Sequence, residues 1–154
     1  DSLRCAGAVT HTSGSGDLVR TLPIASSRGG RPREHRGSGV QTRWRLYAND
    51  QGRAIVKEEL EALGRDASAE IAKAMKRMRT GDIRASDVKP VSGDLYELRV
   101  ALGNNPYRLL FARVGQHEQV LLGLHALYKN TQKLPKTAIQ TANRRLSDWT
   151  ARSR

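Results

Sequence analysis

The chain has 154 residues, enough for one domain with a modest core, and its 27 lysines and arginines against 15 acidic residues give a net charge of +12. This charge makes an acidic partner the first expectation, and nucleic acid is the commonest one, because lysine and arginine release condensed counterions when they neutralise phosphates. A basic but inert surface is the alternative. A membrane span is excluded, since no apolar run approaches the roughly 20 residues that a spanning helix needs. The single cysteine, Cys5, cannot form an internal disulfide, which fits the reducing cytoplasm.

The first 39 residues differ in composition from the rest of the chain. They hold seven of the fourteen glycines and show no sustained helical or strand periodicity. This composition predicts a disordered, basic extension over residues 1–39, whether processed, tagged or translated from upstream, and a folded domain over residues 40–154.

One strand and two helices are expected at the start of the folded domain. Charge and bulk alternate from Arg43 to Tyr47, as in a half-buried strand. Asp50 is expected to cap a first helix that Gly64 ends, and Asp66 to cap a second helix that Gly81 ends. The apolar stripes of these helices are formed by Val56, Leu60 and Leu63, and by Ile71, Ala74, Met75 and Met78.

Three strands and a last helix are expected in the second half. The strands cover residues 95–101, 107–113 and 120–127, with turns between them, and the third is apolar enough to be covered on both faces. A final helix begins near Pro135 with a stripe of Ile139, Ala142, Leu146 and Trp149, while Arg144 and Arg145 point elsewhere. The predicted fold is α/β (α+β) in the order β-α-α-β-β-β-α, an antiparallel-rich sheet packed by helices.

Strand alternation separates the side chains of the first two of these strands. Tyr107, Leu109 and Phe111 share one face, which sends Arg108 to the other face beside Glu97 and Arg99 if the strands form a hairpin.

Three motifs lie in this order along the strands: Glu97-Leu98-Arg99, then Y-R-L-L-F from Tyr107 to Phe111, then Y-K-N-T-Q-K-L-P from Tyr128 to Pro135. Together, over residues 43–149, they resemble the HigB branch of the RelE/ParE toxin superfamily, including its phage-derived relatives. The resemblance implies a small RelE-like fold and a toxin neutralised by a companion antitoxin, usually a HigA-like helix-turn-helix repressor, in a hetero-oligomeric complex. RelE and HigB toxins cut mRNA in the ribosomal A site without metal, whereas ParE relatives poison DNA gyrase on the same scaffold.

The resemblance also implies catalytic residues. Metal-independent RNA cleavage must deprotonate the ribose 2′-hydroxyl, stabilise a dianionic phosphorane and protonate the leaving 5′-oxygen. Arg108 corresponds to the arginine that faces the scissile phosphate, and Tyr128 and Lys129 lie where proton-transfer groups are found. Tyrosine and lysine titrate near pKa 10 when unperturbed, so both need nearby cations to lower their pKa.

Each of these assignments has an alternative. Arg108 can instead pair with Glu97, and Arg99 can either support the site or pair with Asp94 or Glu97. Tyr128 can be a rim aromatic on which a base stacks.

The two histidines of the second half are less suited to catalysis. His125 lies opposite Tyr128 by strand parity and is expected to be a hydrogen-bonded core or edge residue, and His117 to be exposed in a turn.

Further cations are expected to dock ribosomal RNA or the mRNA backbone, although ordinary solvated helix faces are the alternative. They are Arg99, Lys133, Lys136, Arg144, Arg145, Lys73 and Lys76, with Arg77 and Arg79 on the same helix as the last two. The sequence contains no zinc-spaced cluster, phosphate-binding glycine loop or G-x-S-x-G elbow, so no metal or cofactor is expected. The sequence therefore favours a ribosome-dependent mRNA endonuclease; a ParE-like gyrase inhibitor is the rival, and an inactive nucleic-acid-binding module would follow if an ion pair locks Arg108.

Overall fold

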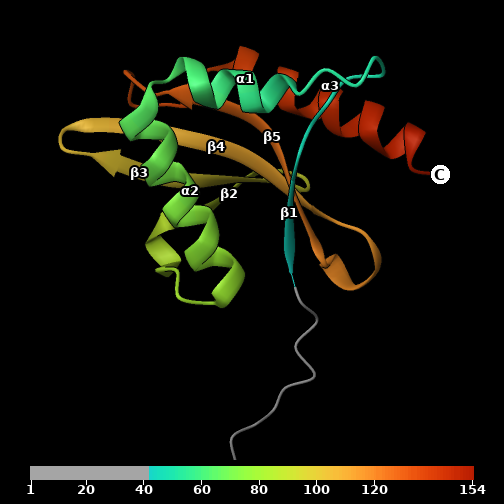
Figure 1. Ribbon diagram of the computed structural model, residues 1–154, viewed down its shortest axis with the longest axis horizontal. Helices are drawn as coiled ribbons and strands as arrows, with labels where there is room; N and C mark the ends of the chain where they lie inside the picture. The colour runs from blue at the N-terminus through green and yellow to red at the C-terminus, as the bar shows by residue number, and fades with distance from the viewer. Residues whose placement is uncertain (1–41) are drawn as a thin grey trace, which may run out of the picture. The chain divides into compact units, whose positions relative to one another are not determined.

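The computed structural model describes residues 42–154, so the extension expected over residues 1–39 lies outside the described residues. Five strands form one sheet in the order β1-β5-β4-β3-β2, in which β1 is parallel to β5 and all other neighbours are antiparallel (Figure 1). The elements are β1 (Arg43–Leu46), α1 (Ile55–Ala62), α2 (Arg65–Thr80), η1 (Ala85–Asp87), β2 (Val88–Ser92), β3 (Leu95–Leu102), β4 (Asn105–Val114), η2 (Gln116–Glu118), β5 (Val120–Tyr128) and α3 (Lys136–Arg152). The α+β fold expected from the sequence is confirmed.

The predicted order of elements lacks the strand β2, which lies between α2 and β3 in the structure, so the prediction is wrong for this segment. Pro90 interrupts the apolar pattern of β2 and cannot donate to a sheet ladder, so the segment does not have the sequence of a central strand. In the structure β2 is an edge strand that pairs only with β3, and its register shifts between Pro90 and Ser92. An edge position accommodates the proline because one side of the strand needs no partner.

Neither predicted aspartate cap forms. The helix α1 begins at Ile55 without a side-chain cap, because the Asn49 carboxamide oxygen already accepts the backbone N–H groups of Gln51 and Arg53 and so extends the turn past Asp50. In α2 the N-cap is Gly64, and Asp66 lies within the first turn, where its charge still favours the positive helix end. Gly81 ends α2 in the left-handed conformation, as expected.

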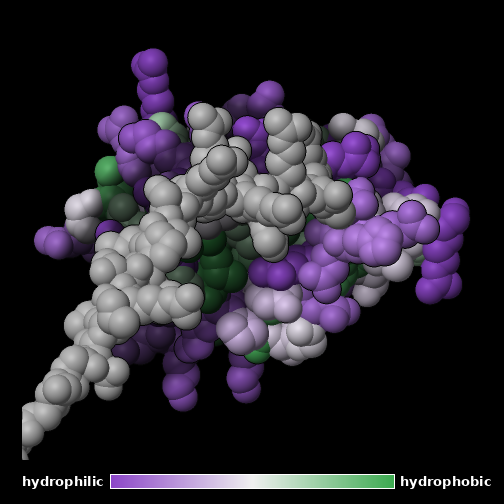
Figure 2. Space-filling view, turned by 90° about the horizontal axis from the view of Figure 1, so that it is seen from below, coloured by the Kyte–Doolittle hydropathy of each residue, from purple (hydrophilic) through white to green (hydrophobic). Residues whose placement is uncertain are grey.

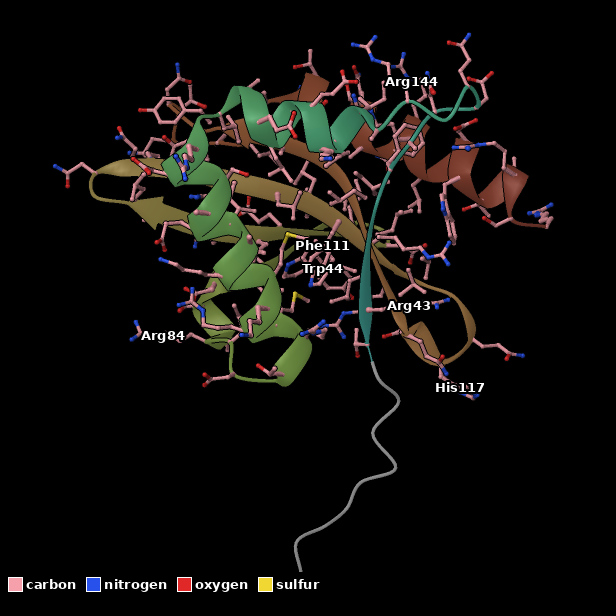
Figure 3. All side chains as sticks on the ribbon, in the orientation of Figure 1. Arg43, Trp44, Arg84, Phe111, His117 and Arg144 are labelled. Atoms are coloured by element: carbon pink, nitrogen blue, oxygen red, sulfur yellow. The ribbon has the colours of Figure 1, made fainter. Side chains whose placement is uncertain are left out.

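The helix α2 packs on one face of the sheet, mainly against β3. Trp44 of β1 donates its indole N–H to the carbonyl of Met75 at 2.8 Å. The Trp44 ring meets Phe111 of β4 edge-on at 5.3 Å, and Figure 3 shows the two side chains between α2 and the sheet. On α2 itself, Ile71 and Ala74 are fully buried, which confirms the apolar stripe predicted for this helix.

The helix α3 packs against β4 and β5 from the other face. Alternation along β4 sends Leu110 to the face opposite Phe111, and Leu110 pairs with His125 of β5, which contacts Arg145 of α3. The predicted stripe of α3 is confirmed, since Ala142 is fully buried and Ile139, Leu146 and Trp149 pack on the core. Between the two layers β5 is the buried central strand that its continuous apolar sequence predicts.

Among the described residues, none of the helices is both long enough and apolar enough to cross a membrane.

Candidate active site

Cations from three adjacent strands meet at one end of the sheet. Arg99, near the end of β3, lies directly opposite Arg108, near the start of β4, in the antiparallel register. Lys129, just after β5, donates its backbone N–H to the Pro106 carbonyl at 2.8 Å and so stays beside the start of β4. The hairpin predicted from the sequence is thus confirmed, with Arg108 beside Arg99 on the face opposite Tyr107.

Glu97 lies within this group of cations. Its side chain is only 6% exposed, with Oε1 3.3 Å from Arg99 Nε and Oε2 3.7 Å from Arg108 Nε. One buried carboxylate therefore faces two guanidinium groups. We name Glu97, Arg99, Arg108 and Lys129 the charged cluster.

Arg108 is buried, with only 10% of its side chain exposed. Burial lowers the pKa of Arg108, Glu97 opposes this effect and Arg99 adds to it. One terminal nitrogen donates to the Tyr107 carbonyl at 2.7 Å, whereas Nε has no hydrogen-bond partner among the described residues. The contact with Glu97 is an ion pair at 3.7 Å without a hydrogen bond, so it orients the guanidinium without taking up one of its hydrogen-bond donors.

Lys129 is also buried, with 8% of the residue exposed. Burial and then repulsion by Arg108 lower the pKa of Lys129. This is the direction expected for a lysine among clustered cations, and it makes the ammonium group a stronger acid than an exposed lysine.

Tyr128 differs from the other predicted catalytic residues because it is 45% exposed. Its Cα partner is Tyr107, and the two rings meet edge-on at 5.5 Å on the face opposite Arg108. Tyr128 is thus at the rim of the sheet end. An exposed ring in this position is available to stack on a base or to exchange a proton.

Two clefts meet at the charged cluster. The larger, of about 510 Å³, is lined by Arg99, Asn104, Pro106, Arg108, Tyr128, Lys129, Asn130, Thr131 and Gln132. The smaller, of about 290 Å³, is lined by Lys89, Pro90, Val91, Glu97, Arg99, Lys129, Gln132, Lys133 and Leu134. Arg99, Lys129 and Gln132 belong to both, and sequence reasoning missed Lys89 because it missed β2.

The structure separates the cations predicted to bind RNA. Lys133 lines the smaller cleft, and Lys136 and Arg144 are exposed on α3, with Arg144 visible in Figure 3. Lys73 and Lys76 are exposed on α2, which lies on the other face of the sheet, and Lys73 pairs with Glu70.

The exposed position expected for Arg145 is wrong. Its guanidinium contacts Glu59 at 2.7 Å and donates to the Leu124 carbonyl at 2.7 Å, with only 13% of the side chain exposed. The cause is the half-buried carboxylate of Glu59 on α1, which the periodicity of α3 alone does not reveal.

Both histidines lie where the sequence predicts. Nδ1 of His125 donates to Glu59 at 2.9 Å, because a carboxylate can only accept, and His117 is exposed in η2. His125 shares a sheet face with Arg108 and lies opposite Tyr128. Within residues 42–154 no group of histidine, cysteine, aspartate and glutamate side chains is arranged to hold a metal ion.

The fold and the charged cluster define a small, basic α+β protein with clustered cations at one end of its sheet. Residues 58–147 match the family described as phage derived protein Gp49-like (DUF891). Two proteins of Mycobacterium tuberculosis, from strains CDC 1551 / Oshkosh and ATCC 25618 / H37Rv, are each named probable endoribonuclease HigB1. Each is 42% identical over 107 residues, which are 69% of this chain and 83% of the relative. The chain belongs to the Gp49-like family and is a HigB-type toxin homologue.

Proposed function

We propose that this protein is the endoribonuclease toxin of a type II toxin-antitoxin system and that it cuts mRNA in the ribosomal A site without metal. The observation that supports this proposal best is the charged cluster, in which Arg99, Arg108 and Lys129 converge on one cleft. The name of the M. tuberculosis relatives favours RNA as the substrate over gyrase as the target.

The cluster is suited to the middle step of RNA cleavage. When the 2′-oxygen attacks, the phosphorane carries two negative charges, and a guanidinium fork can hold two of its oxygens. Arg108 takes this role because it lines the larger cleft together with Arg99 and Lys129. Arg99 lies opposite and adds a second positive charge.

Proton transfer falls to Lys129 and Tyr128. The lowered pKa of Lys129 lets its ammonium group protonate the leaving 5′-oxygen more readily than an exposed lysine would. Tyr128 at the rim either accepts the 2′-hydroxyl proton as a phenolate or stacks on a neighbouring base.

We expect cleavage to depend on the ribosome, because Lys129 and Tyr128 are the only proton-transfer groups assigned to the site and both are weak acid-base catalysts near neutral pH. A ribosome that holds mRNA in a near-attack geometry supplies orientation worth several kcal/mol, and the toxin then adds charge stabilisation. We therefore expect little cleavage of free RNA. A companion helix-turn-helix antitoxin would complete the system, and a ribosomal target requires that the toxin act in the cytoplasm.

The test is a programmed translation reaction in which mRNA ends are mapped by primer extension. Wild-type protein is expected to cut within the A-site codon, and Arg108→Ala to lower the cleavage rate by about 100- to 1000-fold, the loss typical for one transition-state donor. Arg108→Lys is expected to fall between, because lysine keeps the charge and loses the fork. Arg84→Ala removes an exposed arginine outside the cluster and serves as the matched control.

The outcomes separate the candidate functions. Intact mRNA together with blocked DNA supercoiling would replace the nuclease with a gyrase inhibitor. Intact mRNA with normal supercoiling would leave a nucleic-acid-binding module.

A further inference from the structure

Glu97 is the one member of the charged cluster to which the proposed mechanism gives no task. It is an acid buried beside cations from three strands, with 4% of the residue exposed. The surroundings are otherwise repulsive: Arg99 and Arg108 are direct cross-strand neighbours, and like charges in that position destabilise a sheet. A nearby negative charge would offset the repulsion between the two guanidinium groups.

The two oxygens of Glu97 are divided between the two arginines. Oε1 lies 3.3 Å from Arg99 Nε, and Oε2 lies 3.7 Å from Arg108 Nε. The same nitrogen of each arginine thus faces the same carboxylate, which restrains both side chains at once.

The clefts show from which side the carboxylate acts. Glu97 lines the smaller cleft, whereas Arg108 lines the larger one, and Arg99 belongs to both. The carboxylate is therefore not part of the wall of the cleft that Arg108 shares with Tyr128. An incoming phosphate in the larger cleft does not have to displace it.

We propose that Glu97 is a positioning residue that fixes Arg99 and Arg108 in the geometry that an RNA phosphate requires, at the expense of ground-state RNA affinity. The proposal rests on the proposed function. Its basis is electrostatic: the carboxylate lowers the positive potential that attracts RNA, yet it orders the two groups that stabilise the transition state.

This role predicts effects of opposite sign on binding and on turnover. Glu97→Gln preserves the shape of the side chain and removes its negative charge, which raises the net charge of the site by one. RNA should then bind about two- to fivefold more tightly, as expected for one partly screened charge. Cleavage should slow by about 10- to 100-fold, because loosened catalytic groups lose their orientation.

The experiment compares Glu97→Gln, Glu97→Asp and the control Glu118→Gln on programmed ribosomes. Glu118 follows β4 at the end of the strand opposite to the charged cluster, and its carboxylate lies 3.6 Å from Arg113. Its substitution therefore makes the same charge change far from the charged cluster. Single-turnover cleavage gives the rate, and ribosomes carrying mRNA with a 2′-deoxy A-site codon give the affinity without cleavage. Thermal unfolding of each variant reports whether it is folded.

The proposal is supported if Glu97→Gln binds more tightly and cuts more slowly, while Glu97→Asp cuts more slowly with unchanged binding and Glu118→Gln behaves as wild type. Parallel loss of binding and cleavage would reduce Glu97 to a structural residue. Loss of the acid limb of the pH–rate profile in Glu97→Gln would make it a proton acceptor instead and overturn the positioning role. Should wild-type protein fail to cleave, the proposed function itself is wrong, which the variants alone would not show.

Discussion

At the scale of single residues, the buried ammonium group of Lys129 is expected to lower the stability of the folded protein. The ammonium group is buried beside Arg108 and within the field of Arg99 and Lys89, and burial followed by these charges lowers its pKa. A positive charge held in this place costs free energy of folding, because neither water nor a close carboxylate compensates it fully. Under the proposed function this cation serves the reaction and not the fold.

We predict that Lys129→Met makes the protein more stable and abolishes cleavage. Methionine fills a similar volume without the charge, so the free energy of unfolding at pH 7 should rise by about 1 kcal/mol. Urea denaturation measures the stability, and the programmed translation reaction measures the activity.

The pH dependence of this difference has a definite sign. Because the pKa of Lys129 is lower in the folded than in the unfolded chain, the unfolded chain binds the proton more tightly, and the wild type gains stability as pH rises from the folded toward the unfolded pKa. The advantage of Lys129→Met should therefore shrink as pH approaches 10. Lys57→Met, at an exposed lysine, is the control, and a destabilised Lys129→Met would contradict the prediction.

At the scale of elements, a polar junction connects α1, β5 and α3. Glu59 of α1 accepts hydrogen bonds from His125 and from the Ala126 backbone N–H, and it pairs with Arg145 of α3. The Arg145 guanidinium also lies over the Tyr47 ring, 5.6 Å from its centre. Burial by itself would raise the pKa of Glu59, but the hydrogen bonds from His125, Arg145 and Ala126 outweigh it and lower the pKa to about 2.

We predict that this junction makes the protein sensitive to acid. A carboxylate whose pKa is lowered on folding stabilises the protein above its unfolded pKa, near 4.5, and this contribution is lost as pH falls toward about 2. A shift of this size corresponds to on the order of 3 kcal/mol. Glu59→Gln should therefore lower the free energy of unfolding at pH 7 and flatten its pH dependence between about pH 4.5 and 2.

Urea denaturation at a series of pH values tests this junction. Glu61→Gln is the matched control, because Glu61 lies on the same helix with its side chain 65% exposed. If the free energy of unfolding of Glu59→Gln falls with decreasing pH as steeply as that of the wild type, other carboxylates cause the acid sensitivity.

At the scale of the whole molecule, exposed cations lie on both sides of the sheet. Lys76 on α2 and Lys136 at the start of α3 are exposed on elements that pack on opposite faces. Among the coloured residues in Figure 2, most of those at the surface are hydrophilic. A protein with cations on several sides can contact RNA on several sides, as a protein wedged into the ribosome would. Under the proposed function these cations dock the toxin, whereas the charged cluster cuts.

We predict that ribosome binding weakens steeply with salt and that single neutralisations reduce this dependence. Lys76→Gln and Lys136→Gln should each weaken binding and lower the slope of log K against log salt by about one, the value for one lost phosphate contact. Titration of labelled protein with ribosomes at several KCl concentrations measures the slope. Lys57→Gln, which neutralises a lysine beside Glu61, should leave it unchanged, and equal slopes for all variants would show that neither lysine meets a phosphate.

Most of the fold could be predicted from local patterns. Alternation placed Arg108 beside Arg99 and away from Tyr107, and helical periodicity identified the stripe around Ala142, because both patterns depend only on backbone geometry. The strand β2 could not be found in this way, since Pro90 contradicts strand propensity and only pairing with β3 stabilises it.

The sequence by itself determined the excess of cations, the apolar periodicity and the motifs that identify the family. Tertiary structure decided which of the charged residues face one another. Glu59 and Arg145 meet across 86 positions of sequence, between α1 and α3, which no local pattern indicates. The physical reason is that the energy of a charge depends on its burial and on the charges within a few ångströms of it, and both are set by the packing of elements that lie far apart in the sequence.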